Sequence, residues 1–393
     1  EVEPEVEPEV EPEVEPEVEP EVEPEVVPEV ESEASRAQLE DTYDKLLRLL
    51  NDRKISLYRP EDGEPYIIDG PASVLYRFDP DYNVDPKKVE AQGKSLHLIL
   101  KLEEQQKVRI SMHLGCVNID VPKLSHERYY VKAQELWEKW RRPIDGLAVP
   151  IGINQRKEII DIIFSDADSP HLLIGGTTGG GKSEALNTIL RGLLEYYSAK
   201  ELGLILVDPK GNELIEFENS PFLKESIGTN ASDAIEMLGK CVSEMEYRNK
   251  TLFTEASRAN NKRINSITAY NKLVDDSKKL PWWLIVLDEY HDLTSDPDDK
   301  KEVERLIGRL AAKARSAGIH IIIATQKPTV EVINSTLRSN LPAQLALSVK
   351  NVHDSRVIMD ENGAEVLNGK GDGFLKLGGK LNRIQCAWIP GDD

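Results

Sequence analysis

Residues 176–183 constrain this chain more than any other segment, because they read Gly-Thr-Thr-Gly-Gly-Gly-Lys-Ser. The apolar residues 172–174 precede this run, and residues 184–194 after it resemble a helix. A strand, the pattern G-x-x-x-x-G-K-[ST] and a helix in this order are typical of a phosphate-binding loop. The alternative is a glycine-rich turn that happens to precede a lysine, and the agreement of motif and context disfavours it.

The residue types in this loop suit the binding of a nucleoside triphosphate. Glycines let the backbone curl so that successive N–H groups and the start of the next helix point at phosphate oxygens. Lys182 would supply a cation to the β and γ phosphates, and Ser183 would offer a hydroxyl to Mg²⁺. We therefore predict ATP and Mg²⁺ as cofactors. The predicted nucleotide-binding residues are Gly176, Thr177, Thr178, Gly179, Gly180, Gly181, Lys182, Ser183 and Glu184.

A second motif ends another apolar run. Residues 284–287 are Leu-Ile-Val-Leu, and the acidic residues Asp288 and Glu289 follow them. This is a Walker B arrangement, in which Asp288 would hold the Mg²⁺ shell and Glu289 would orient or deprotonate the attacking water. Two acids at the end of a strand are weak evidence alone. With the phosphate-binding loop they predict an ATPase site, in which the two strands can lie side by side in one sheet.

A third candidate for this site is Gln326. It follows the predicted strand of residues 320–324 and Thr325. A polar amide at a strand tip can touch the γ-phosphate or the attacking water and so sense hydrolysis. The alternative is a glutamine that only caps the following turn.

Apolar runs alternate with long helical segments from residue 148 onward. The runs are residues 172–174, 204–207, 283–287, 320–324 and 345–349. This alternation predicts an α/β fold with a central, mainly parallel sheet flanked by helices, and ligand chemistry at the carboxyl ends of its strands.

The chain before residue 148 has a different pattern. Helical spacing covers residues 34–51, a second helix is predicted around 86–102, and β-rich runs lie at 73–78 and 107–110. These elements predict a small accessory α+β domain. We therefore expect an accessory domain over residues 33–147 and an ATPase domain over residues 148–393.

Residues 1–31 repeat Glu-Val-Glu-Pro almost perfectly. Each proline removes a backbone donor and the like charges repel, so residues 1–32 are predicted to be a disordered, solvated linker. An acidic tail that competes with DNA for a basic channel is the less favoured alternative. The fifteen glutamates of this segment account for most of the net charge of −21 and leave −6 on residues 33–393. That remainder is compatible with DNA bound in a locally basic channel.

Composition also bears on cellular location. No apolar run is long enough to span a membrane and no basic-then-apolar leader begins the sequence, so we expect a cytoplasmic segment without membrane contact. Cys116, Cys241 and Cys386 lie far apart and are expected to be reduced and buried. Because Glu1 stands where a methionine would, we expect a piece of a longer protein, and an upstream membrane anchor stays open.

The sequence resembles the FtsK/SpoIIIE DNA translocases over residues 172–376. The resemblance is carried, in the order of that family, by Asp208-Pro209-Lys210-Gly211, residues 245–248, Tyr270-Asn271, Asp288-Glu289, residues 309–311, 314–320 and 324–328, Asp354-Ser355-Arg356, residues 363–365 and 369–372. Weaker likeness to the accessory domain that precedes the motor in those proteins covers residues 70–71, 108–110 and 115–122.

This resemblance implies a RecA-like motor that assembles as a ring, expected to be a hexamer, and moves double-stranded DNA through its pore by ATP hydrolysis. The nucleotide then lies between subunits, and an arginine of the neighbouring subunit stabilises charge on the transferring phosphoryl group. Arg315 matches that position. Its alternative role is an ordinary surface ion pair on a helix.

The chain departs from the family pattern at three places. Where a trans-acting lysine is common, two residues before Asp354, this sequence has Val352, although Lys350 lies nearby. An arginine frequent in the family is Gln344 here. The winged helix that reads DNA sequence would follow residue 375 and is not found before Asp393, so we expect sequence-neutral translocation, or loading directed by other proteins of a larger assembly.

The best candidates for DNA contact are four basic residues. Lys210 lies in the loop after the second strand, and Arg258, Lys262 and Arg263 lie in a segment that mixes cations with amides. Such a mixture suits phosphate contacts without base readout. The alternative is an ordinary solvated loop.

Two other functions compete with a DNA translocase. Related motors of secretion and conjugation move protein or couple DNA to a pore, but the secretion motors usually join several ATPase domains, whereas one is predicted here. A scaffold that binds nucleotide without hydrolysing it is disfavoured, because Lys182, Asp288 and Glu289 are all present.

Overall fold

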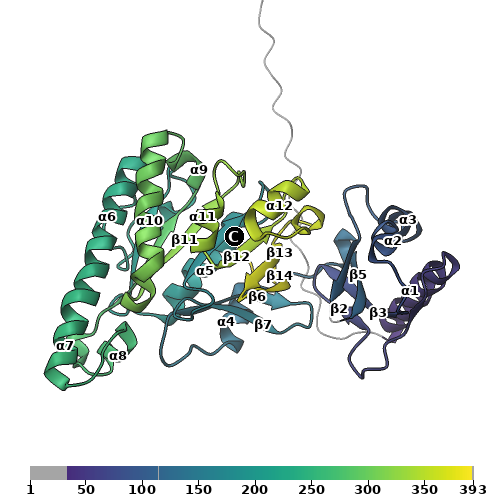
Figure 1. The fold of residues 1–393 in the computed structure, drawn as a ribbon, viewed down its shortest axis with the longest axis horizontal. Helices are drawn as coiled ribbons and strands as arrows, with labels where there is room; N and C mark the ends of the chain where they lie inside the picture. The colour runs from purple at the N-terminus through teal and green to yellow at the C-terminus, as the bar shows by residue number, and fades with distance from the viewer. Residues whose placement is uncertain (1–32, 114, 392–393) are drawn as a thin grey trace, which may run out of the picture.

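The computed structural model describes residues 33–113 and 115–391. Figure 1 shows a large sheet covered by helices and, at the other end of the molecule, a small sheet formed by the earlier part of the chain. The acidic repeat of residues 1–32 lies outside the described residues, so its disorder stays a prediction. Among the helices that are described, none has the length and apolar character needed to cross a membrane.

The large sheet contains nine strands in the order β7-β6-β14-β13-β12-β8-β11-β10-β9. Their bounds are β6 (Ala148–Asn154), β7 (Ile159–Ile163), β8 (His171–Gly175), β9 (Leu202–Val207), β10 (Trp282–Leu287), β11 (Ile319–Thr325), β12 (Ala343–Leu347), β13 (Asp372–Leu377) and β14 (Lys380–Cys386). Strands β12, β8, β11, β10 and β9 run parallel to one another, which confirms the predicted α/β architecture.

Helices cover both faces of the large sheet. They are α4 (Ala133–Lys139), α5 (Lys182–Tyr196), α6 (Ala231–Tyr247), α7 (Phe253–Asn260), α8 (Ile267–Asn271), α9 (Tyr290–Leu293), α10 (Pro297–Ala317), α11 (Ser335–Asn340) and α12 (Val352–Met359). Short 3₁₀ turns lie at Ser125–Glu127, Ile215–Phe217, Asp276–Lys278 and Ala364–Val366, and a π-helical turn lies at Arg248–Leu252.

Alternate residues of the central strands enter two separate cores. In β11, Ile321 and Ile323 pack with α6 and α10, whereas Ile322 and Ala324 pack with α5. Burial on both faces explains why the strands of this sheet read as continuous apolar runs rather than as alternating ones. The long helices α6 and α10 lie side by side on one face (Figure 1).

Four strands extend the parallel sheet in an antiparallel sense, from β13 to β7. Sequence reasoning placed no strand at these positions, although β13 and β14 have a clear turn signal between them. Gly378 and Gly379 both have positive φ, 53° and 77°, which is the geometry of a two-residue type I′ hairpin turn. The turn therefore folds β14 back on β13 and carries the sheet toward the small domain.

The small sheet has the order β1-β3-β5-β4, with β2 paired to β3. Its strands are β1 (Leu57–Tyr58), β2 (Ile67–Asp69), β3 (Ser73–Pro80), β4 (Arg109–His113) and β5 (Cys116–Pro122), and its helices are α1 (Glu33–Asp52), α2 (Pro86–Glu90) and α3 (Gly93–Ile99). The continuous helix predicted around residues 86–102 is wrong, because the structure divides it into α2 and α3. Glycine has a low helix propensity, and Gly93 begins α3 directly after the break.

A buried ionic cluster joins the two sheets. The Arg383 guanidinium of β14 contacts Asp120 of β5 at 2.7 Å and Asp372 of β13 at 2.7 and 3.0 Å. All three side chains are at most 5% exposed. Burial would lower the pKa of Arg383, but the two carboxylates raise it above its ordinary value, so this residue stays charged.

We predict that Arg383→Met lowers the free energy of unfolding by about 3–5 kcal/mol, because it leaves Asp120 and Asp372 buried without their cation. Denaturant unfolding followed by tryptophan fluorescence measures this loss. Arg305→Met is the control, since it removes an exposed pair with Glu302, and it should leave the unfolding midpoint unchanged. Equal midpoints for both variants would contradict a structural role for the cluster.

Candidate nucleotide-binding site

The phosphate-binding loop lies between β8 and α5, as the motif predicts. Gly179 and Gly181 have φ values of 79° and 97°, a backbone conformation that favours glycine. A Cβ at Gly181 would lie 2.5 Å from the backbone nitrogen of Gly371. The glycines of the motif are therefore required both by backbone conformation and by close packing.

The start of α5 presents hydrogen-bond donors to this loop. Among the described residues, the backbone N–H groups of residues 181–184 have no protein acceptor, whereas the N–H of Ala185 donates to the carbonyl of Gly181. The first N–H groups of a helix, together with its dipole, form a ready anion site. This geometry suits a phosphate group of a nucleotide.

Residues 368–371 lie against the phosphate-binding loop and hydrogen-bond to its backbone. The N–H groups of Lys370 and Gly371 donate to the carbonyls of Gly179 and Gly180 at 3.2 and 3.0 Å. Arg128, which is 8% exposed, donates to the carbonyls of Asn368 and Gly369 at 3.0 and 2.9 Å. Residues 368–371 therefore connect the phosphate-binding loop with the chain that leads out of the small sheet.

Asp288 lies directly beyond the end of β10 and pairs with Lys182 of the phosphate-binding loop. The expectation that β8 and β10 are neighbours is wrong, because β11 lies between them. Since all three strands end at the same edge, the lysine still reaches the carboxylate. Both side chains are at most 3% exposed. Burial raises the pKa of Asp288 above its ordinary value, although Lys182 acts in the opposite direction.

Glu289 follows in a left-handed conformation, with φ 42° and ψ 58°, and is 2% exposed. This conformation is uncommon outside glycine and turns its side chain toward the tip of β11. One carboxylate oxygen, Oε1, accepts from the N–H of Gln326 at 3.2 Å and from the Thr325 hydroxyl at 3.4 Å. The side-chain oxygen of Gln326 in turn accepts from Thr178 at 3.1 Å. Gln326 therefore links the Walker B glutamate to the phosphate-binding loop.

Lys210 reaches the same glutamate, a contact that sequence reasoning missed. Its Nζ lies 3.0 Å from Oε2 of Glu289. The loop after β9 is held by buried Asp208, whose carboxylate accepts from the N–H groups of Lys210, Gly211, Glu213 and Leu214. The only sequence signal was the Asp-Pro-Lys-Gly run at the end of a strand.

Arg315 lies at the opposite edge of the sheet from the phosphate-binding loop. It is exposed near the end of α10, just before β11 begins, whereas the loop follows Gly175, which lies opposite Thr325 at the far end of β11. A strand of this length spans roughly 20 Å at about 3.3 Å per residue. Arg315 therefore does not reach the nucleotide site of its own chain.

Three of the four predicted DNA contacts lie at the same end of the strands as Arg315. Arg258, Lys262 and Arg263 are exposed and make no ion pair among the described residues. Phe253 and Ile267 of the surrounding segment belong to the same hydrophobic core as Trp282 at the start of β10. The structure thus separates these three residues from Lys210, which it places beside Glu289.

The structure locates the residues at which this chain departs from the family pattern. Gln344 is buried in β12, and Val352 begins α12. Lys350 lines a cavity of about 480 Å³ beside the phosphate-binding loop, bounded also by Thr178, Lys107 and Arg128. Lys350, two residues before the position where the family has its lysine, therefore lies next to the nucleotide site of its own chain.

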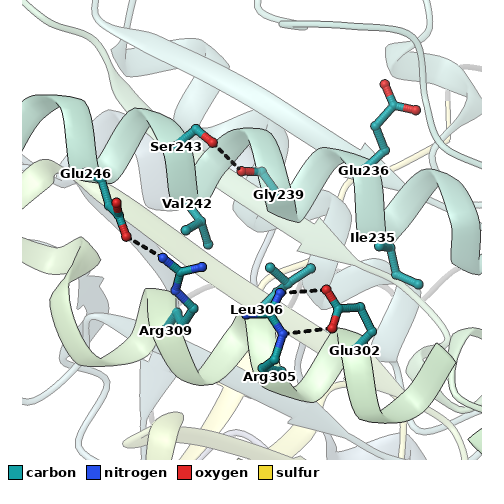
Figure 2. Close-up of a pocket in the computed structure, with 10 residues that line it drawn as sticks. All are labelled: Ile235, Glu236, Gly239, Val242, Ser243, Glu246, Glu302, Arg305, Leu306 and Arg309. Carbon is teal, nitrogen blue, oxygen red and sulfur yellow. Dashed lines mark hydrogen bonds and ion pairs between the residues drawn. The ribbon is translucent and has the colours of Figure 1, made fainter. Parts of the chain in front are cut away.

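The family motifs at residues 245–248 and 309–311 meet away from this site. A groove of about 340 Å³ lies between α6 and α10. In it Glu246 pairs with Arg309 and Glu302 pairs with Arg305 (Figure 2). Nearby Arg248, 1% exposed, donates to the carbonyls of Pro281 and Ala317 at 2.8 and 2.9 Å. These motif residues fix helices against the sheet.

Ser183, at the start of α5, and Asp288, directly after β10, offer oxygen atoms that suit Mg²⁺. In the described part of the chain no cluster of three or more acidic, histidine or cysteine side chains could hold a metal alone. Mg²⁺ commonly takes one or two protein ligands and completes its shell with water and substrate phosphates. The donor set therefore fits Mg²⁺ that arrives with a nucleotide.

Comparison with known proteins agrees with this geometry. The FtsK/SpoIIIE family model matches residues 131–330. The DNA translocase FtsK of Borreliella burgdorferi is 33% identical over 310 residues, which are 78% of this chain and 38% of that protein. The protein of the same name from Clostridium tetani is 35% identical over 334 residues, 82% of this chain and 43% of that protein. The chain thus spans about two-fifths of these relatives.

Solved structures share the fold. The pCW3 conjugation coupling protein TcpA, in a monomer form with ATPγS, aligns with a TM-score of 0.58 at 20% identity over 90% of this chain and 95% of that one. The cytoplasmic domain of the Thermomonospora curvata type VII secretion ATPase EccC aligns with a TM-score of 0.54 at 26% identity over 67% of this chain and 31% of that one.

The fold and the loop define an α/β domain of the P-loop type. The match of the family model over half of the chain, together with the identity to the curated relatives, identifies the family. The chain belongs to the FtsK/SpoIIIE family.

We predict that Gly181→Ala abolishes nucleotide binding while the fold is retained. An added Cβ meets the backbone of Gly371, and alanine is strained at a φ of 97°. Titration with a fluorescent ATP analogue measures the affinity. Gly93→Ala, at a position where an added Cβ meets nothing within 4 Å, is the control and should bind as the wild type does. Normal affinity in Gly181→Ala would show that the loop is not the binding site.

Proposed function

We propose that this chain is an ATP-driven motor that moves double-stranded DNA and works as a homo-oligomeric ring, expected to be a hexamer. The observation that carries the proposal is the meeting of Lys182, Asp288, Glu289 and Gln326 at one edge of the parallel sheet. The identity of 33–35% to DNA translocases, against 20% to the conjugation coupling protein, favours DNA translocation over a conjugation or secretion motor. Sequence reasoning places this motor in the cytoplasm.

Each residue has a distinct task in the proposed reaction. Lys182 would exchange Asp288 for the β and γ phosphates of a bound nucleotide, which would leave the Asp288 carboxylate able to hold Mg²⁺. Mg²⁺, held by Ser183 and Asp288, would neutralise charge that develops on the phosphates. Glu289 orients the water and takes its proton as the water oxygen bonds to the γ phosphorus and the bond to the ADP oxygen breaks. Gln326 senses the loss of the γ-phosphate.

The position of Arg315 supports a ring with shared sites. This exposed arginine lies across the sheet from the nucleotide site of its own chain, so any role that it has in hydrolysis is at the site of a neighbouring copy. There it would stabilise charge on the transferring phosphoryl group, as an arginine finger does. Arg258, Lys262 and Arg263 are proposed to contact the DNA backbone.

Steady-state ATPase measurements with two variants test the roles of the central residues. Lys182→Ala should abolish turnover, because the phosphates lose their cation. Glu289→Gln should bind ATP but hydrolyse it about 10²–10⁴-fold more slowly, because the water loses its base. Linear duplex DNA should stimulate the wild type. Normal rates in both variants would refute these roles, and absence of stimulation by any duplex would favour the secretion-type alternative.

Mixing two inactive variants tests the shared site. We predict that Lys182→Ala and Arg315→Ala are each inactive alone, but that equal amounts mixed before ring assembly recover ATPase activity. In random rings about a quarter of the interfaces combine an intact Lys182 with an intact Arg315 from the neighbouring subunit. Lys182→Ala mixed with Glu289→Gln is the control and should stay inactive, because both changes affect the same side of the interface. No recovery in the first mixture would show that Arg315 is not a trans-acting residue.

A further inference from the structure

Both carboxylates at the end of β10 are paired with a lysine, but the two pairs differ in exposure. The Lys182–Asp288 pair is buried on both sides, with side chains at most 3% exposed. In the second pair Glu289 is 2% exposed while the Lys210 side chain is 39% exposed. Lys210 therefore connects the interior of the site with its surface, where a large ligand has access.

With Lys210 in contact, both carboxylate oxygens of Glu289 accept a hydrogen bond. Oε1 already accepts from the Gln326 N–H, and Oε2 accepts from the Lys210 ammonium at 3.0 Å. Charge-assisted hydrogen bonds are stronger than neutral ones, so an oxygen that binds an ammonium is a poorer acceptor for the proton of a water molecule. The ion pair thus holds Glu289 in place and weakens it as a base.

The backbone of the loop that carries Lys210 is held by hydrogen bonds, whereas the lysine side chain is held, among the residues that the structure describes, only at its tip, by the pair with Glu289. Four N–H groups donate to buried Asp208 at 2.9–3.0 Å, including that of Lys210 itself. A lysine side chain has a flexible stem and three donors, so its ammonium can exchange one oxyanion for another without a change in the loop. Contact with Glu289 also keeps the pKa of Lys210 above its ordinary value, despite partial burial.

We propose that Lys210 is a positioning residue that restrains Glu289 until a phosphate of duplex DNA draws the ammonium away. Sequence reasoning placed Lys210 among the DNA contacts, and the structure places it against the glutamate proposed to activate water. One side chain would thus serve both sites in turn. The inference rests on the proposed function and adds to it a route by which DNA accelerates hydrolysis.

Duplex DNA is the occupant that the exposure favours. Its phosphates form a continuous array of anions that a surface lysine can meet without base recognition. The γ-phosphate of ATP is the other oxyanion in reach of the site, and a lysine that binds it would be needed for nucleotide affinity. The separation of KM from kcat distinguishes the two.

The test compares steady-state ATPase rates of the wild type, Lys210→Met, Lys210→Arg and Lys250→Met, each with and without linear duplex DNA. Lys250→Met is the matched control, because it removes an equal charge and a Lys–Glu pair of 2.9 Å at the surface. Lys210→Met should raise kcat without DNA about fivefold, with KM for ATP unchanged, and duplex should add little. A half-exposed ion pair worth about 1 kcal/mol corresponds to this factor at 1.36 kcal/mol per tenfold.

The remaining variants distinguish release of Glu289 from a general loss of structure. Lys210→Arg keeps the positive charge opposite Glu289, so its rate without DNA should stay near that of the wild type, and Lys250→Met should match the wild type in both conditions. If Lys210→Met is unfolded by thermal melting, Lys210→Gln, which keeps a hydrogen-bond donor but no charge, takes its place with the same expected rise.

Three outcomes overturn the inference. A fall in kcat with and without DNA would make Lys210 a direct participant in hydrolysis, a raised KM would make it a nucleotide ligand, and an unchanged rate without DNA would make it at most a simple DNA contact. Failure of the proposed function looks different, because the wild type itself would then hydrolyse no ATP or ignore duplex. If the wild type hydrolyses ATP but ignores DNA, the rate of Lys210→Met still decides whether the ion pair restrains Glu289.

Discussion

The common direction of five buried strands is the constraint on which the site depends. Because β12, β8, β11, β10 and β9 are parallel, the loops after them emerge at a single edge. Helices on both faces exclude water from the strands and leave this edge as the place where polar side chains gather. The phosphate-binding loop, the two acids and Gln326 come together there although 150 residues separate the first from the last.

At this edge two buried carboxylates are paired with lysines, and a third, that of Asp208, is held by backbone N–H groups. Asp288 and Glu289 are nearly inaccessible, and each carboxylate is matched by a lysine from another strand connection. An unpaired charge in such surroundings is costly, so the lysines stabilise the site. In the proposed reaction cycle they also define what would change, since a phosphate that binds either lysine would free a carboxylate. The same principle holds where Arg383 joins the two sheets.

The parallel strands and the site motifs could be predicted from the sequence because each is a local pattern. Apolar runs fully buried in a sheet are continuous, and a loop such as residues 176–183 needs glycine at fixed positions. Sequence reasoning missed the antiparallel extension, because polar or charged residues interrupt β7, β13 and β14, and Pro150 and Gly152 disfavour a strand over the apolar residues of β6. It joined α2 and α3 into one helix. It also placed β8 beside β10, since chain order does not determine strand order.

The sequence by itself determined that a triphosphate-binding loop and a strand ending in two acids are present, because these features follow from residue types at short spacing. Only the tertiary structure decided that Lys210 faces Glu289 and that Arg315 lies across the sheet from its own loop. Both facts depend on which strands are neighbours and on where long side chains end. These are properties of packing between distant segments, and no local pattern encodes them.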